Sequence, residues 1–247
     1  MQSNKISIII PARYESTRLP GKPLMEVANK PIIQWVYEKA SQSRLAGEVI
    51  VATDDERIHN AVKSFGGKVC MTSSSHASGS DRIAEVINKN PDIDIAVNVQ
   101  GDEPLIDPAS IDLAIDALIS DSKADITTLI RLITDEEELK TPNIVKAVID
   151  NNEYALYFSR YCIPYARGDY KANHYAHLGF YVYKRDALLR MTSLESSDLE
   201  QAECLEQLRA LQNGIKIKTV KVNYKPIGID TMEDLNNFRE YIEKGFR

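Results

Sequence analysis

Three short β-rich runs alternate with helical patterns in the first half of the chain. The runs are KISIII at 5–10, EVIVAT at 48–53 and IDIAVNV at 93–99. Strands that alternate with helices form a parallel sheet, because each crossover places a helix over one of its faces. The pattern therefore predicts an α/β fold with a mainly parallel central sheet flanked by helices. Ligands of such sheets bind at the carboxyl ends of the strands.

Apolar residues at helical spacing lie between and after these runs. Two stripes, before and after the second run, consist of Ile32, Ile33, Val36, Tyr37 and Ala40, and of Ile58, Ala61, Val62 and Phe65. A third follows Asp107 and Pro108, which have the pattern of an N-cap and a first-turn proline. We expect a helix at each stripe.

The second half has a different pattern from about Ile126. The β-like runs TLIRLI, VKAVID, YALYFSR and LGFYVY follow one another with little helical pattern between them, which predicts a small antiparallel extension. A helix from Leu199 to Gln212, the strand IKIKTVKV and a final helix capped by Thr231 and Asp234 complete the chain. We expect one domain over 1–247, whose pattern changes between residues 125 and 126.

Composition excludes several classes of protein. A formal net charge of −6 argues against a nucleic-acid-binding surface, which needs clustered excess Lys and Arg. The apolar run near the N-terminus stops at Pro11, too early for a signal peptide or a membrane span, so we expect a cytoplasmic protein without membrane contact. The three cysteines form no CxxC pair and suggest neither a zinc site nor a disulfide framework.

The basic loop PARYESTRLPGKP follows the first strand, at the edge where ligands bind. Arg13, Arg18 and Lys22 supply three cations, while Ser16 and Gly21 add a hydroxyl and an approachable backbone. A triphosphate needs this combination, because its charge must be neutralised and its geometry fixed. The spacings of the Walker and GxGxxG motifs are absent. A solvated basic loop is the alternative.

Two acidic residues are candidates for binding a metal. Asp102 follows the strand that ends in VNVQG, and Asp230 follows Gly228 and Ile229 before the final helix. Mg²⁺ prefers oxygen ligands and often uses only one or two carboxylates beside phosphate oxygens and waters. Each residue also has a local alternative, since Asp102 could cap a turn and Asp230 could begin a helix.

Other polar residues could recognise an acidic or polyhydroxylated acceptor. His177, Tyr181 and Tyr183 have the even spacing of one strand face, although the first interval crosses Gly179. Glu203 and Gln207 would be i and i+4 neighbours on the expected helix, with Glu206 close by. The alternatives are a core edge and a solvated helix face. Arg160 could clamp a carboxylate or end a strand, and His76 lies in a serine-rich loop.

Several segments in this order resemble the 3-deoxy-manno-octulosonate (Kdo) cytidylyltransferases, also called CMP-Kdo synthetases. They are PARYESTRLPGKPL, ATDDERI, GDEPLI, VKAVID, YALYFSR, HLGFYVY, CLEQLRAL and GIDTMEDL, spread over nearly the whole chain. The resemblance implies a glycosyltransferase-A-like nucleotidyltransferase fold and a homodimer. It also implies a nucleotide-binding half at 1–125 and a sugar-binding and dimerisation half at 126–247. It also implies a reaction of CTP with Kdo that gives CMP-Kdo and pyrophosphate for the lipopolysaccharide inner core, with Mg²⁺ as cofactor.

The resemblance assigns roles to residues of this chain. Those implied for the CTP phosphates are Arg13, Ser16, Arg18 and Lys22, and those for Mg²⁺ are Asp102 and Asp230. Ser80 and Arg82 would approach the cytosine and ribose. The implied sugar pocket comprises Gln100, Arg160, His177, Tyr181, Glu206 and Gln207. We expect Arg18, Lys22, Asp102 and Asp230 to carry the catalysis.

One segment departs from the family pattern. Many relatives have GTER where this chain has GSDR at 79–82, and the shorter Ser and Asp side chains reduce the reach of this segment. Rival interpretations are CTP-dependent activation of 8-amino-Kdo or a sialic acid, a non-catalytic nucleotide-binding module, and a glycosyltransferase. A module would not need two metal carboxylates, and glycosyltransferases commonly have DxD where this chain has GDE.

Overall fold

The computed structural model describes residues 4–15, 19–169 and 171–245, which form two compact units. Unit 1 consists of the described residues within Met1–Asp112 and Pro226–Arg247, and unit 2 of those within Leu113–Lys225. The boundary falls within the helix α4 (Pro108–Ser120). The expected division of binding roles at residues 125 and 126 stays a prediction, because compactness does not report on ligands.

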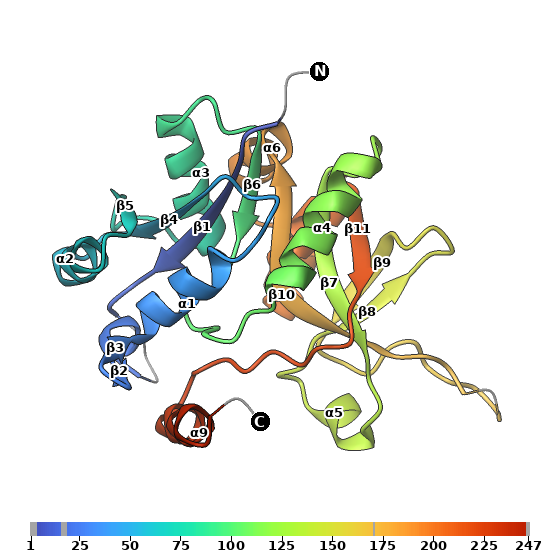
Figure 1. Ribbon diagram of the computed structural model, residues 1–247. Helices are drawn as coiled ribbons and strands as arrows, with labels where there is room; N and C mark the ends of the chain where they lie inside the picture. Colours follow the sequence, from blue (N-terminus) through green and yellow to red (C-terminus); the bar gives the residue numbers. More distant parts are fainter. Residues whose placement is uncertain (1–3, 16–18, 170, 246–247) are drawn as a thin grey trace. The chain divides into compact units, whose positions relative to one another are not determined.

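Unit 1 contains the predicted parallel sheet, in the order β6-β1-β4-β5 (Figure 1). Its strands are β1 (Ile6–Ala12), β4 (Glu48–Thr53), β5 (Lys68–Met71) and β6 (Ile95–Asn98). Ser7 on β1 pairs with Glu48 on one side and with Ala96 on the other. Ile8, Ile9 and Ile10 are consecutive and fully buried, so both faces of β1 are covered. The predicted α/β architecture is confirmed.

The helices of unit 1 follow the predicted stripes, with one addition. They are α1 (Ile32–Ala40), α2 (Glu56–Ser64), α3 (Gly79–Lys89) and the start of α4, with a short η1 (Lys22–Leu24) and a hairpin of β2 (Glu26–Val27) and β3 (Lys30–Pro31). β5 and α3 were not predicted. Ser78 and Asp81 form a capping box at the start of α3, so the serine-rich segment ends in a helix.

The C-terminal segment belongs to unit 1. Its helix α9 (Met232–Glu243) begins at the predicted capping box of Thr231 and Asp234. Leu235 and Phe238 are buried, and the Phe238 ring meets the Trp35 ring edge-on at 5.7 Å. This packing holds the last helix against the first, which brings the segment around Asp230 into the unit that contains the basic loop.

Unit 2 contains the predicted antiparallel extension. Its strands are β7 (Ile126–Leu132), β8 (Lys146–Ile149), β9 (Ala155–Ser159), β10 (Tyr175–Lys184) and β11 (Ile217–Lys221). β10 pairs antiparallel with β7 and β8, and β8 pairs antiparallel with β9. β11 pairs parallel with β7, so the strands of unit 2 form both antiparallel and parallel pairs.

The helices of unit 2 differ from the predicted single helix over Leu199–Gln212. The structure has α5 (Glu136–Lys140), α6 (Arg185–Ser193), α7 (Asp198–Glu203) and α8 (Gln207–Gln212). Cys204 lies between α7 and α8 with a φ of 51°, and this left-handed conformation ends α7. Glu203 and Gln207 are therefore not i and i+4 neighbours on one helix. Across the described ranges, no helix combines the length and apolar character needed to cross a bilayer.

Candidate active site

A cleft of about 460 Å³ lies in unit 1, beyond the carboxyl ends of β1 and β6. Four of the predicted site residues line it, namely Arg13, Lys22, Gln100 and Asp102. The remaining wall comes from their chain neighbours and from Ala77 and Gly79. The basic loop and Asp102 therefore line one cleft, at the sheet edge where the sequence predicts that a ligand binds. Ser16 and Arg18 lie outside the described residues.

Gly101 sets the depth of this cleft. A Cβ atom at Gly101 would lie 2.9 Å from the carbonyl oxygen of Pro11, closer than real side chains approach a backbone. Glycine therefore lets the end of β6 pass directly beside the end of β1. The close approach places Asp102 within reach of the loop that follows β1.

Lys22 joins the two predicted metal carboxylates. Its Nζ atom lies 2.6 Å from Asp102 Oδ2 and 3.1 Å from Asp230 Oδ1. The backbone N–H of Ile229 donates a hydrogen bond of 2.9 Å to the carbonyl of Asp102, which fixes the C-terminal segment beside the end of β6. Only 11% of the Lys22 side chain is exposed, so its charge interacts with both carboxylates in a partly desolvated setting.

Asp102 and Asp230 fit a magnesium site in which the substrate's phosphate oxygens supply some of the ligands. Within the described ranges, no three His, Cys, Asp or Glu side chains form a metal-binding group. Mg²⁺ usually takes only one or two carboxylates and completes its shell with phosphate oxygens and water. Two carboxylates that already converge on one cationic atom, at the edge of a cleft with basic residues, provide that donor set.

Glu103 is a weaker candidate for a metal ligand than its neighbour. Burial of its side chain, and then the charge of Asp102, raise the pKa of Glu103 to about 8. The carboxyl group is therefore mostly protonated at neutral pH, and a protonated carboxyl is a poor ligand for a divalent cation. Asp102 is therefore the better candidate for a metal ligand in this acidic run.

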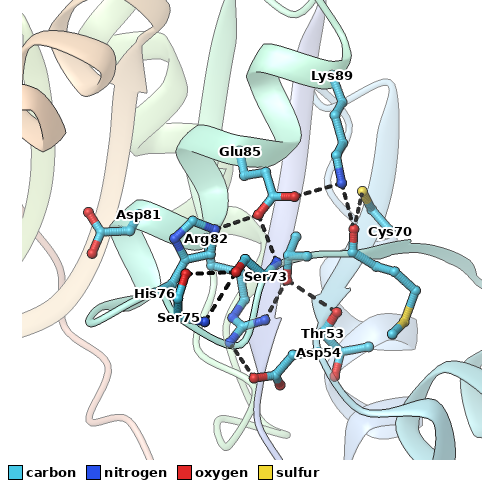
Figure 2. A network of polar contacts seen from close by, with 12 residues as sticks. Thr53, Asp54, Cys70, Ser73, Ser75, His76, Asp81, Arg82, Glu85 and Lys89 are labelled. Atoms are coloured by element: carbon cyan, nitrogen blue, oxygen red, sulfur yellow. Dashed lines mark hydrogen bonds and ion pairs between the residues drawn. The ribbon is translucent and has the colours of Figure 1, made fainter.

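A polar network holds the segment between β5 and α3, which forms one wall of the cleft (Figure 2). Glu85 on α3 accepts hydrogen bonds from Ser73 N at 2.8 Å and from the His76 ring, and it pairs with Lys89 at 2.6 Å. The carbonyl of His76 accepts from the Arg13 guanidinium. Lys89, then the Ser73 N–H, lower the pKa of Glu85 to about 2. One carboxylate thereby connects α3 to an arginine of the cleft.

Ser80 and Arg82 belong to the helix that was not predicted. Both lie on α3, and their side chains are buried. The Arg82 guanidinium pairs with Asp54 at 3.0 Å and donates to the Thr72 hydroxyl. Arg82 therefore ties α3 to the ends of β4 and β5, and its predicted contact with the nucleotide stays a prediction.

Unit 2 brings together several of the residues predicted for the sugar. The ring of His177 lies 5.3 Å from that of Tyr181, which lies 5.6 Å from that of Tyr183, so the three share a face despite the bulge at Gly179. Burial lowers the pKa of His177 to about 3, and burial and the nearby Tyr183 and Glu206 raise the pKa of Tyr181. Glu206 therefore lies close enough to act on this aromatic row.

Arg160 is engaged by backbone carbonyl groups. Its guanidinium donates to the carbonyls of Glu203 at 2.7 Å, Pro142 at 3.1 Å and Cys204 at 3.2 Å. These bonds tie the end of β9 to the break between α7 and α8. Gln207, at the start of α8, is 6% exposed, and its Nε2 atom has no hydrogen-bond partner among the described residues. A buried donor without a partner is costly, so a ligand atom is its natural acceptor.

Lys146 is a buried cation that sequence reasoning overlooked. The side chain is fully buried, and Nζ donates to the carbonyls of Thr141 at 3.0 Å, Ile144 at 2.8 Å and Arg160 at 2.6 Å. Desolvation lowers its pKa. Its only signal in the sequence is a charge in the apolar run VKAVID, a pattern that also suits an ordinary edge strand. Lys146 fixes the backbone that carries Arg160.

Comparison with known proteins relates the chain to nucleotide transfer. The family model for cytidylyltransferases matches residues 7–217. A protein of Fusobacterium nucleatum named 3-deoxy-manno-octulosonate cytidylyltransferase is 46% identical over 96% of each chain. A protein of the same name from Thermodesulfovibrio yellowstonii is 52% identical over 92% of this chain and 94% of its own.

Two solved structures that match the fold of this chain are also nucleotidyltransferases. A CMP:2-keto-3-deoxy-manno-octonic acid synthetase, solved in complex with CTP, matches with a TM-score of 0.93 and 44% identity over 98% of this chain and 99% of its own. A 4-diphosphocytidyl-2C-methyl-D-erythritol synthase from Anaerococcus prevotii matches with a TM-score of 0.64 and 18% identity over 98% of this chain, which relates the fold alone. The predicted nucleotidyltransferase fold is confirmed.

Proposed function

The chain belongs to the cytidylyltransferase family, and we propose that it is a 3-deoxy-manno-octulosonate cytidylyltransferase, which activates Kdo with CTP to give CMP-Kdo and pyrophosphate. Relatives named for this reaction are about half identical over almost the whole chain. The observation that supports the proposal best within this molecule is the convergence of Asp102 and Asp230 on Lys22, at the edge of a cleft that Arg13 also lines.

The reaction is an in-line displacement at the α-phosphorus of CTP. The anomeric hydroxyl oxygen of Kdo forms a bond to this phosphorus, the bond from the α-phosphorus to the bridging oxygen breaks, and pyrophosphate leaves with that oxygen. The hydroxyl proton passes to solvent. Negative charge shifts onto the leaving group, so cations fixed in advance stabilise the transition state more than the ground state.

Residues of unit 1 hold the nucleotide in this proposal. Lys22 and Arg13 bind the phosphates, together with Ser16 and Arg18, and the segment with Ser80 and Arg82 is assigned to the base and ribose. Lys22 is already oriented by two carboxylates, so little side-chain freedom is lost when a phosphate replaces one of them. Asp102 and Asp230 would hold Mg²⁺, which would neutralise negative charge on the phosphate oxygens.

Residues of unit 2 recognise the acidic sugar. His177 and Tyr181 form an aromatic row beside Glu206, and Gln207 offers a buried donor. The family resemblance assigns Arg160 and Gln100 to the sugar as well. A polyhydroxylated acid needs both donors and acceptors from the protein, and this set supplies both.

The cellular setting is also part of the proposal. A homodimer in the cytoplasm would supply CMP-Kdo for the inner core of lipopolysaccharide. The named relatives support the product, and the expectation of a dimer rests on the resemblance of the sequence. Gel filtration with light scattering tests the dimer directly, with a mass of twice 27.8 kDa as the expected result.

Pyrophosphate release tests the activity. The purified protein is incubated with each of the four ribonucleoside triphosphates, with and without Kdo and Mg²⁺. We expect release only with CTP, Kdo and Mg²⁺ together. Release without Kdo, or none with CTP, would overturn the proposal. Substitution of Kdo by 8-amino-Kdo or a sialic acid, at equal concentration, then measures the preference for the sugar.

A further inference from the structure

A bulge in β10 places two polar groups on one buried hydroxyl. His177 pairs with Ile130 across β7, but Tyr181 pairs with Thr128, so four steps along β10 span two along β7. Gly179, with a φ of 40°, lies inside this bulge. As a result the Thr128 hydroxyl oxygen lies 2.6 Å from the carbonyl oxygen of Phe180 and 2.9 Å from His177 Nε2.

The two contacts of Thr128 fix the positions of the protons. A hydroxyl group carries one proton, and the carbonyl of Phe180 can only accept a hydrogen bond. The Thr128 proton therefore points to Phe180, and only lone pairs of Oγ1 face the imidazole. Nε2 of His177 must carry a proton to complete the second contact.

The surroundings of the ring keep His177 neutral. Phe158 meets it at 4.8 Å between ring centroids and Tyr181 at 5.3 Å, and neither supplies a negative charge. Burial lowers the pKa of His177 to about 3. A neutral imidazole that is protonated on Nε2 has a lone pair on Nδ1, and no described residue donates a hydrogen bond to that atom.

We propose that Thr128 is a positioning residue that fixes the Nε2–H tautomer of His177. Within the sugar pocket already assigned to His177, its Nδ1 atom then accepts a hydrogen bond from a hydroxyl group of the sugar. This inference rests on the proposed function. A lone pair on Nδ1 attracts a hydroxyl proton and repels a carboxylate. His177 therefore reads a hydroxyl of the acidic sugar and not its carboxylate.

Gln207 is a second buried polar residue of unit 2. It directly follows Glu206, whose charge acts on Tyr181, the ring next to His177. The residue is 6% exposed, and its Nε2 atom has no hydrogen-bond partner among the described residues. An acceptor at Nδ1 and a donor at Gln207 suit the hydroxyls of a polyol, each of which can donate and accept.

Nitrogen NMR of the imidazole tests the tautomer in the wild-type protein without any substrate. With ¹⁵N-labelled histidine, long-range proton–nitrogen correlations at pH 7 distinguish the two neutral tautomers and the imidazolium. We expect the Nε2–H form at His177. The Nδ1–H form or the cation would overturn the inference and leave the proposed function intact, since that function is tested by pyrophosphate release.

Variants of Thr128 test its positioning role. Thr128→Val keeps the shape and removes the hydroxyl, and we expect a mixture of tautomers and a KM for Kdo raised about 10-fold, with the KM for CTP unchanged. Thr128→Ser should restore both values. A role in stability alone would raise neither KM selectively, and equal changes in both KM values would contradict the inference.

Sugars that lack single hydroxyl groups identify the partner of Nδ1. For one such sugar, the wild type and His177→Phe should have nearly equal KM values, because the lost hydrogen bond is missing in both. For the other sugars His177→Phe should remain the weaker enzyme by about 10-fold. If neutralising the sugar carboxylate abolishes the difference instead, His177 reads the carboxylate and the inference is wrong.

Discussion

Lys22 and Asp230, separated by most of the sequence, meet at 3.1 Å, and the same ammonium group contacts Asp102 at 2.6 Å. The contact depends on two backbone features of unit 1. Gly101 brings the end of β6 against β1, and the Ile229 N–H binds the carbonyl of Asp102. One lysine thus offsets the charges of two carboxylates at the edge of the cleft.

Asp102→Asn and Asp230→Asn should each reduce pyrophosphate release by about 100-fold or more while the protein stays folded. Each change keeps the shape of the side chain and removes the negative charge that a divalent cation requires. Steady-state rates at saturating CTP and Kdo measure the loss, and thermal unfolding checks the fold. Asp116→Asn, at an exposed position on α4, is the control for loss of one surface charge. A near-normal rate in Asp102→Asn would contradict its assignment.

Glu85→Gln should raise the KM for CTP about 10-fold and leave the KM for Kdo unchanged. The amide cannot accept from Ser73 N, His76 and Lys89 as a carboxylate does, so the wall that holds Arg13 through the His76 carbonyl loosens. Lost hydrogen bonds to a charged group also cost about 1.5–3 kcal/mol of stability. Initial rates over a range of each substrate, and urea unfolding, measure the two effects.

Lys89→Met is the matched control for Glu85. It removes the half-exposed i,i+4 partner, which contributes about 0.5 kcal/mol or less, and the hydrogen bond of 2.8 Å from Lys89 Nζ to the Met71 carbonyl. The bonds from Glu85 to the cleft wall remain. We expect a KM for CTP close to the wild-type value. If Lys89→Met raises the KM for CTP as much as Glu85→Gln does, the change of charge on α3 explains the effect. The connection from Glu85 to Arg13 would then not be its cause.

Gly101→Ala should lower both stability and activity. The added Cβ would lie 2.9 Å from the Pro11 carbonyl, so β6 and β1 must separate at the base of the cleft. Overpacking of this kind costs about 1–3 kcal/mol. Gly228→Ala is the control, since a Cβ there meets no atom within 4 Å. Its free energy of unfolding should be unchanged or higher by up to about 1 kcal/mol. Urea unfolding of both variants gives the comparison, and equal stabilities would contradict the packing argument.

Sequence patterns predicted the framework of the site better than its details. β1, β4 and β6 are apolar runs with clear ends, and the basic loop after β1 and Asp102 after β6 could be placed at one sheet edge without coordinates. The helix α3 was missed although Ser78 and Asp81 repeat the capping signature that identified α9 at Thr231 and Asp234. Its apolar stripe was present but the serines before it suggested a loop.

Other features had no local signal. The break at Cys204 requires a left-handed backbone that cysteine rarely adopts, so a continuous helix was the reasonable expectation from its neighbours. The ring contacts of His177 and the tautomer set by Thr128 depend on the register shift in β10, and even spacing along one strand cannot reveal the register of another. Contacts between distant segments decide these details.

The stability of the protein should fall on acidification partly because of His177. Burial holds its pKa near 3 in the folded state, against about 6.5 in the unfolded chain. Between these values the unfolded chain binds a proton that the folded protein does not, so the folded state loses stability as the pH falls below 6.5. The contribution is at most about 1.4 kcal/mol for each pH unit.

His177→Phe removes this titration. The difference in free energy of unfolding between wild type and variant should be constant from pH 7.5 to 8 and should shift against the wild type by up to about 2 kcal/mol at pH 5. Urea unfolding at these pH values measures it, and parallel curves down to pH 5 would mean that His177 takes up its proton equally well in both states.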